Sequence, residues 1–189
     1  DIVWILVSAT LVFFMQAGFA LLESGMSRAK NAINVMMKNY IDVCIGSLLF
    51  WAVGFGIMFG YNPTGFFGTT AFGLSEGSNW DFTFLLFQTM FAATAVTICS
   101  GAMAERTRYT AYLLSAAAIV TFIYPVFGSW AWGGSYGGQG WLAELGFIDF
   151  AGSTVVHSLG AWCALAGVIA VGARTGRFDN SGKVRNIPG

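Results

Sequence analysis

The stretch "DFAGSTVVHSLGAWCALAGVIAVG", residues 149–172, sets the class of this fold. It starts at Asp149, contains the one histidine of the chain, His157, and carries no other charged side chain. About 20 apolar residues in α-helical conformation cross the roughly 30 Å hydrocarbon core of a bilayer. This stretch therefore predicts a membrane-spanning helix.

The whole chain has the composition of a membrane protein. Hydrophobic residues make up 56% and charged residues 10% of the 189, and the mean hydropathy is +0.67. Soluble domains carry about a quarter charged residues, so the composition excludes that class. An open sheet leaves backbone groups unpaired in lipid, and the apolar runs lack the alternation of a membrane barrel. We therefore predict an all-α polytopic bundle of five transmembrane helices, at residues 2–22, 41–60, 82–103, 109–132 and 153–172.

Basic residues predict the orientation. All nine follow the first, third or fifth span, and they are Arg28, Lys30, Lys38, Arg106, Arg108, Arg174, Arg177, Lys183 and Arg185. Cytoplasmic flanks are enriched in Lys and Arg. We expect a multi-pass protein of the plasma membrane with its N-terminus outside. The first run has no basic region before it, so we interpret it as a span and not as a removable signal.

An odd number of spans has a consequence for domain organisation. A second copy of a five-span unit would sit inverted in the bilayer, which is the plan of many transporters. We expect residues 1–172 to form one half of such an inverted-repeat protein. The basic, turn-rich residues 173–189 would then be a cytoplasmic linker to a second half.

His157 is the first candidate site residue. At helical spacing it shares a face with small residues, which are Gly160, Ala161, Ala164 and Gly167. Such stripes allow close helix packing in membranes, so we expect this face to point into the bundle. An ionisable side chain there is a functional candidate, with a structural hydrogen bond as the alternative.

Five further features each allow a structural interpretation. Phe91 lies on an aromatic stripe typical of packing, and Trp132 lies where a membrane-interface tryptophan is expected. Asp149 precedes a helix, so it is either a cap or a site residue. Lys38 and Asp42 are four residues apart and predict an interfacial pair. The three cysteines lack paired spacing and are interpreted as inert thiols, and we expect no metal or cofactor.

Longer motifs resemble the ammonium transporter (Amt/Mep/Rh) family, closer to its plant and cyanobacterial type than to its Rh branch. The motifs are "MQAGFALLESGMSRAKNAINVMMKN" (15–39), "FQTMFAATAVTICSGAMAER" (87–106), "WAWGGSYGGQGWL" (130–142) and "DFAGSTVVHSLGAWCALAGVIAVGARTGRF" (149–178). They cover nearly all of the chain.

The resemblance implies functions for four residues. His157 corresponds to the first of two pore histidines, Trp132 and Phe91 to the outer ammonium site and gate, and Asp149 to a structural acid beneath that site. Ammonium would be recruited, deprotonated and conducted as ammonia past the histidine. The resemblance also implies a transporter and not an enzyme, a homotrimer, a PII-type regulatory protein as cytoplasmic partner, and no nucleic acid. The partner histidine, a second gate phenylalanine and a serine come from later helices of the family.

Two other functions stay open. An ammonium-sensing membrane domain of a signalling protein would need the same recognition chemistry, and the segment after the second half would discriminate it from a transporter. An intramembrane hydrolase using His157 as a base is weaker, since the surroundings of Ser100 and Ser153 predict no oxyanion hole.

Overall fold

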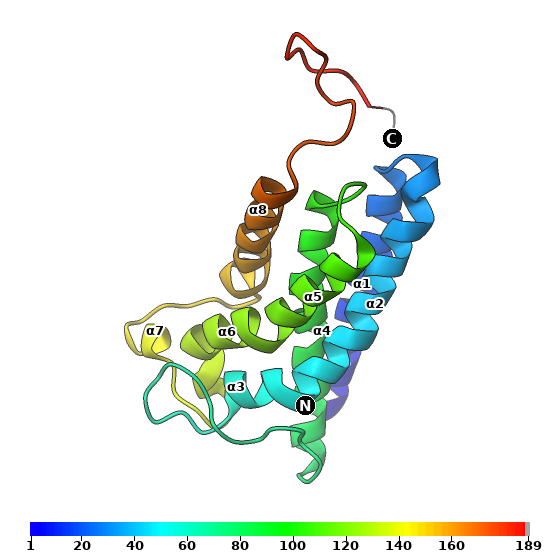
Figure 1. The fold of residues 1–189 in the computed structure, drawn as a ribbon. Coiled ribbons are helices and arrows are strands. Elements are labelled where there is room, and N and C mark those ends of the chain that lie inside the picture. The colour runs from blue at the N-terminus through cyan, green and yellow to red at the C-terminus, as the bar shows by residue number, and fades with distance from the viewer. Residues whose placement is uncertain (188–189) are drawn as a thin grey trace.

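In the computed structural model, which describes residues 1–187, five helical segments are long and apolar enough to cross a membrane (Figure 1). They confirm the predicted number and class. Their bounds are Ile2–Gly25, Ala29–Phe59, Asn79–Ala102, Tyr109–Ser135 and Ser153–Val171.

The second segment begins twelve residues earlier than predicted, at Ala29 and not at residue 41. The predicted start was wrong because it placed the beginning of the segment after Lys38. The structure buries Lys38 completely inside the bundle, so the charge does not end the helix.

Two of the segments change helix type midway. The second consists of η1 (Ala29–Asn31), α2 (Ala32–Leu49), the π-helical turn η2 (Phe50–Gly54) and α3 (Phe55–Phe59). The fourth consists of α5 (Tyr109–Ala118), the π-helical turn η3 (Ile119–Ile123), α6 (Tyr124–Trp132) and η4 (Gly133–Ser135).

Pro125 and Gly54 explain where the two segments meet. Pro125 has no N–H to donate, and the wider turn of η3 precedes it in the chain. A Cβ on Gly54 would lie 2.8 Å from the Val120 carbonyl oxygen, so only glycine permits this approach of η2 to η3.

The third segment, α4 (Asn79–Ala102), forms the centre of the bundle. It packs against α1 (Ile2–Gly25), α2 and α8 (Leu159–Val171). Ser78 and Asp81 form a capping box at its start, and small residues such as Ala92 and Ala95 are fully buried along it. A central helix with small side chains allows its neighbours to approach closely.

Figure 1 shows the N-terminus, α3, α6 and the short α7 (Trp141–Glu144) at one end of the bundle. The turn between α1 and α2 and the end of α8 lie at the opposite end, where the basic residues occur. Beyond α8, the Asp179 carboxylate accepts hydrogen bonds from the Ser181 and Lys183 N–H groups and closes a hairpin. The last two residues of the predicted linker lie outside the described residues.

Candidate functional site

Phe91 of α4 and Trp132 at the end of α6 lie together. Their ring centroids are 6.3 Å apart and their planes make an angle of 75°, an edge-to-face arrangement. Phe87 packs edge-to-face against Phe91 at 4.9 Å. Both Phe91 and Trp132 are half-buried against the core, so part of each ring is accessible to a cation.

Trp132 also makes a hydrogen bond within the protein. Its indole Nε1–H donates a 2.6 Å hydrogen bond to the backbone carbonyl of Asp149. Buried indoles generally find such a partner. The contact ties the aromatic pair to the segment that leads into the helix of His157.

Asp149 caps that helix. Its two carboxylate oxygens accept backbone hydrogen bonds from the N–H groups of Gly152, Ser153, Thr154 and Val155, at 2.7–3.0 Å. Burial raises the pKa of the carboxyl, but these backbone donors outweigh it and hold the pKa below its ordinary value. The cap interpretation is therefore confirmed, and the same residue positions both Trp132 and the start of the fifth span.

His157 differs from the expectation, because its side chain is exposed among the described residues. It lies in the π-helical turn η5 (Ser153–Ser158), where its N–H donates to the Gly152 carbonyl at 2.9 Å. The spacing of an α-helix does not continue through a π-helical turn, so His157 does not share one face with the small residues of α8 as predicted. Gly160 and Ala164 are buried as expected, whereas His157 points away from the packed side.

The small residues of α8 pack directly on α4. A Cβ on Gly160 would lie 2.9 Å from the Ala95 carbonyl oxygen and 3.0 Å from the Ile98 Cβ. The Gly160 carbonyl accepts a 3.2 Å hydrogen bond from the Cys99 thiol. This close packing fixes α8 relative to the helix of Phe91, as the stripe of small residues predicted.

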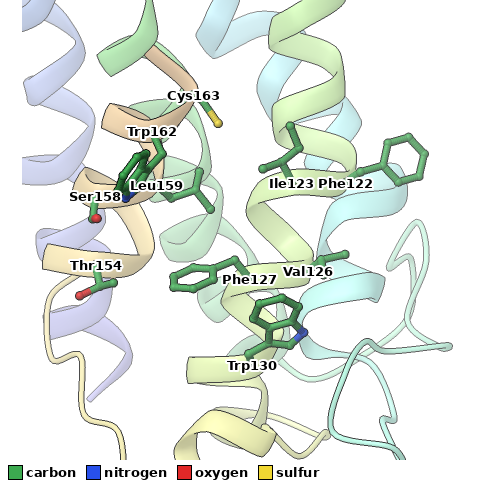
Figure 2. A pocket seen from close by; sticks show the side chains of 10 residues that line it. All are labelled: Phe122, Ile123, Val126, Phe127, Trp130, Thr154, Ser158, Leu159, Trp162 and Cys163. Carbon is green, nitrogen blue, oxygen red and sulfur yellow. The ribbon is translucent and has the colours of Figure 1, made fainter. Parts of the chain in front are cut away.

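A groove of about 670 Å³ lies between α6 and η3 on one side and α8 and η5 on the other (Figure 2). Its lining is apolar apart from Thr154 and Ser158, and neither His157 nor Trp132 belongs to it. Figure 2 shows Phe127 and Trp130 on one wall and Leu159 and Trp162 on the other. The groove is thus adjacent to the candidate residues but is not the predicted cation site.

Glu105 joins three segments at the basic end of the bundle. Its carboxylate accepts hydrogen bonds from the Arg28 N–H at 2.7 Å and from the Asn31 amide at 3.0 Å, and Arg174 lies 3.6 Å away. Burial raises the pKa of this carboxyl, but the donors from Asn31 and Arg28 outweigh it and lower the pKa to about 2. The turns before α2 and α5 and the exit of α8 are therefore held by one ionised group. No sequence pattern predicted this contact.

Lys38 and Asp42 do not form the predicted interfacial pair. Lys38 is 0% exposed and Asp42 is 1% exposed, so neither lies at a surface. The ion pairs found within residues 1–187 do not include them and join Glu105 to Arg28 and Arg174. Both lie in a polar cluster that also includes Gln16 and Glu23 of α1. Gln16 and Glu23 are seven residues apart, so they lie on one face of a helix. This spacing of two polar residues in an apolar segment was a sequence signal for the cluster.

Within residues 1–187, no group of three or more His, Cys, Asp and Glu side chains could hold a metal ion. The four candidates instead form two contacts, Phe91 with Trp132 and Trp132 with Asp149, and His157 follows in the capped helix. The arrangement offers aromatic rings, a fixed acid and an accessible imidazole.

Comparison with known proteins identifies the family. The model of the Ammonium Transporter Family matches residues 3–189. The chain is 48% identical to ammonium transporter Amt2 of Archaeoglobus fulgidus, covering 100% of this chain and 42% of the relative. It is 43% identical to ammonium transporter 1 member 3 of Solanum lycopersicum, covering 95% of this chain and 40% of the relative.

Solved structures agree. A structure described as a sensor Amt protein has a TM-score of 0.95 and 44% identity, covering 98% of this chain and 47% of the other. The crystal structure of Candida albicans Mep2 has a TM-score of 0.81 and 34% identity, covering 92% of this chain and 39% of the other. The chain thus spans less than half the length of these relatives. With its five apolar helices, the chain is a multi-pass membrane protein that belongs to the ammonium transporter family.

Proposed function

We propose that this chain forms one half of a pathway that conducts ammonium-derived nitrogen across the plasma membrane. The observation that carries the proposal is the contact of Phe91 with Trp132, held by the bond from Trp132 to Asp149. Aromatic faces attract a cation by about 0.5–2 kcal/mol, and by more where water is excluded. The half-buried ring pair would recruit ammonium from outside.

Deprotonation follows from the cost of moving charge. A charged group at the bilayer centre costs roughly 2.5–3.5 kcal/mol or more, whereas ammonia is neutral. The proposed route therefore loses the proton near the aromatic pair and conducts ammonia past His157. A neutral imidazole has one donor and one acceptor nitrogen, so it can bind ammonia or pass on a proton.

The exposure of His157 supports a pore wall completed by other residues. We propose that residues 1–172 are the first half of an inverted repeat, that 173–189 lead to the second half, and that the longer protein assembles as a homotrimer with its N-terminus outside. The share of each relative that the chain covers, 42% for Amt2 of Archaeoglobus fulgidus, fits this division. The basic end of the bundle would face the cytoplasm, where a PII-type protein would bind.

An ammonium sensor is the second candidate. The observation that favours it is the likeness to the sensor Amt protein, with a TM-score of 0.95. Such a protein would use the same aromatic site and continue into a signalling module. The segment after the second half of the longer protein separates the two candidates.

Trp132→Leu in the longer protein tests the site. Loss of about 0.5–2 kcal/mol of cation–π attraction corresponds to a roughly 2-fold to 30-fold weaker apparent affinity for ammonium. Uptake of ammonium in competition with methylammonium and potassium measures this. The matched control is Trp4→Leu, which removes an exposed tryptophan of α1. An unchanged affinity in folded Trp132→Leu would remove Trp132 from the proposed site.

A further inference from the structure

A polar cluster lies between α1, α2, α4 and α5, within the spanning part of the bundle. Its members are buried, and they are Gln16, Glu23, Lys38, Asn39, Asp42, Thr97, Ser100 and Tyr112. Neither the aromatic pair nor His157 belongs to it. Polar side chains in a membrane interior are costly, so a group of this size calls for a function of its own.

Lys38 is the one amine among these side chains. Its ammonium nitrogen is 5.1 Å from the centroid of the Tyr112 ring, a cation–π distance. The Tyr112 hydroxyl donates a 2.6 Å hydrogen bond to Asp42 Oδ2, so the ring is held beside a carboxyl group. Within the described residues, Lys38 Nζ is fully buried and has no hydrogen-bond partner.

Oxygen atoms with free acceptor capacity belong to the same cluster. In the described part of the chain, Asn39 Oδ1, Asp42 Oδ1 and Ser100 Oγ are buried without a hydrogen-bond partner. The Asn39 amide donates to Glu23 Oε2 at 2.9 Å, which links the second carboxyl group to the cluster. Unsatisfied buried acceptors are unfavourable, so these oxygen atoms have capacity for N–H donors.

We propose that this cluster is a binding site for a primary ammonium group, and that the side chain of Lys38 is its resident cation. The donor set decides the ligand class. With Lys38 as the occupant, the carboxyl groups of Glu23 and Asp42 remain as the groups of the site, and they favour a cation over an anion. An aromatic face beside carbonyl and hydroxyl oxygens suits an ammonium group better than a bare metal ion, which prefers oxygen ligands alone.

The site has a structural consequence. Lys38 of α2 lies over the Tyr112 ring of α5, and Glu23 of α1 and Ser100 of α4 are buried in the same cluster, so the cluster collects side chains from four helices. Truncating Lys38 to alanine removes three methylene groups and the ammonium group. The removed atoms correspond to those of n-propylammonium, so this compound matches the vacated space in size.

Chemical rescue of Lys38→Ala tests the proposal on the longer protein, purified in detergent. We expect its apparent melting temperature to fall by on the order of 10 °C, because one partner of a buried charged cluster is lost. Adding n-propylammonium chloride should restore part of this loss and restore more as its concentration rises. Sodium chloride at equal ionic strength and n-propanol, the neutral analogue, should restore none.

Three controls make the result specific. The unmodified chain and Lys38→Met, which fills the space without a charge, should not respond to n-propylammonium. The double variant Lys38→Ala with Asp42→Asn should respond less than Lys38→Ala. Lys30→Ala, in the turn before α2, should melt like the unmodified chain.

Equal effects of n-propylammonium and sodium on Lys38→Ala would overturn the proposal, as would an equal response of the unmodified chain. If Lys38→Ala is not folded in sodium, the yield of monodisperse protein extracted in each salt becomes the measurement, and equal yields would overturn the proposal. The measurement is stability and not transport, so its failure leaves the proposed function untouched.

Discussion

Removing the carboxylate of Asp149 should loosen the start of the fifth span. Asp149 accepts four backbone hydrogen bonds, two on each oxygen, from the residues that begin η5. Asparagine keeps one oxygen as an acceptor and presents an amide to the other pair of N–H groups. Alanine removes all four acceptor contacts. The two variants therefore divide the contribution of the cap.

The expected magnitude follows from the number of bonds. At a net contribution of about 1 kcal/mol each, Asp149→Asn should cost about 2 kcal/mol and Asp149→Ala about 4 kcal/mol of unfolding free energy. For a chain of this size, 1 kcal/mol shifts the melting temperature by roughly 2–4 °C. Asparagine should therefore lower it by roughly 4–8 °C and alanine by about twice as much.

Thermal denaturation followed by size-exclusion chromatography in detergent measures both variants, with Glu144→Gln at the end of α7 as an exposed control. The pKa of Asp149 is lowered in the folded protein, so its ionised form stabilises the fold above the ordinary pKa of 3.8. That stabilisation disappears as the pH falls through the folded pKa, and the difference between Asp149→Asn and the unmodified chain should shrink with it. Melting temperatures of both variants equal to that of Glu144→Gln would refute the capping argument.

Three further predictions concern the rest of the bundle. Glu105→Gln should destabilise the chain at neutral pH. The ionised Glu105 carboxylate has a lowered pKa of about 2, so its contribution to stability disappears as the pH falls from 4.5 to about 2. The melting curves of the variant and the unmodified chain should therefore converge over that range. Gly160→Ala should lower the melting temperature more than Gly167→Ala, since its Cβ would meet the Ala95 backbone at 2.9 Å whereas that of Gly167 meets a flexible methionine side chain; equal losses would contradict the close helix contact. His157→Phe in the longer protein should abolish ammonium current while ammonia permeability in liposomes persists if the histidine carries the proton, and wild-type values of both in folded protein would show that it does not act in the pathway.

The class of the fold and the number of spans could be predicted from the sequence, because apolar length and backbone satisfaction in lipid leave few alternatives. The close packing of Gly160 could be predicted too, since a stripe of small residues at helical spacing favours a near approach of two helices. The capping position of Asp149 was one of two stated interpretations. A carboxylate just before a helix can accept hydrogen bonds from the N–H groups that begin the helix, which are close in sequence, so this position could be predicted.

Which polar groups meet depended on the tertiary structure. Lys38 resembles a cytoplasmic flank in sequence because charge normally ends a span, yet it is fully buried and lies over the ring of Tyr112, from a helix distant in sequence. His157 lies in a π-helical turn, which no residue pattern marked, so its α-helical face was predicted wrongly. Trp132 meets Phe91 and the Asp149 carbonyl, which accepts its N–H from seventeen residues along the chain, and the local sequence marks neither partner. Local periodicity fixes which face of a helix is apolar, whereas contacts between helices depend on their relative placement, which periodicity does not contain.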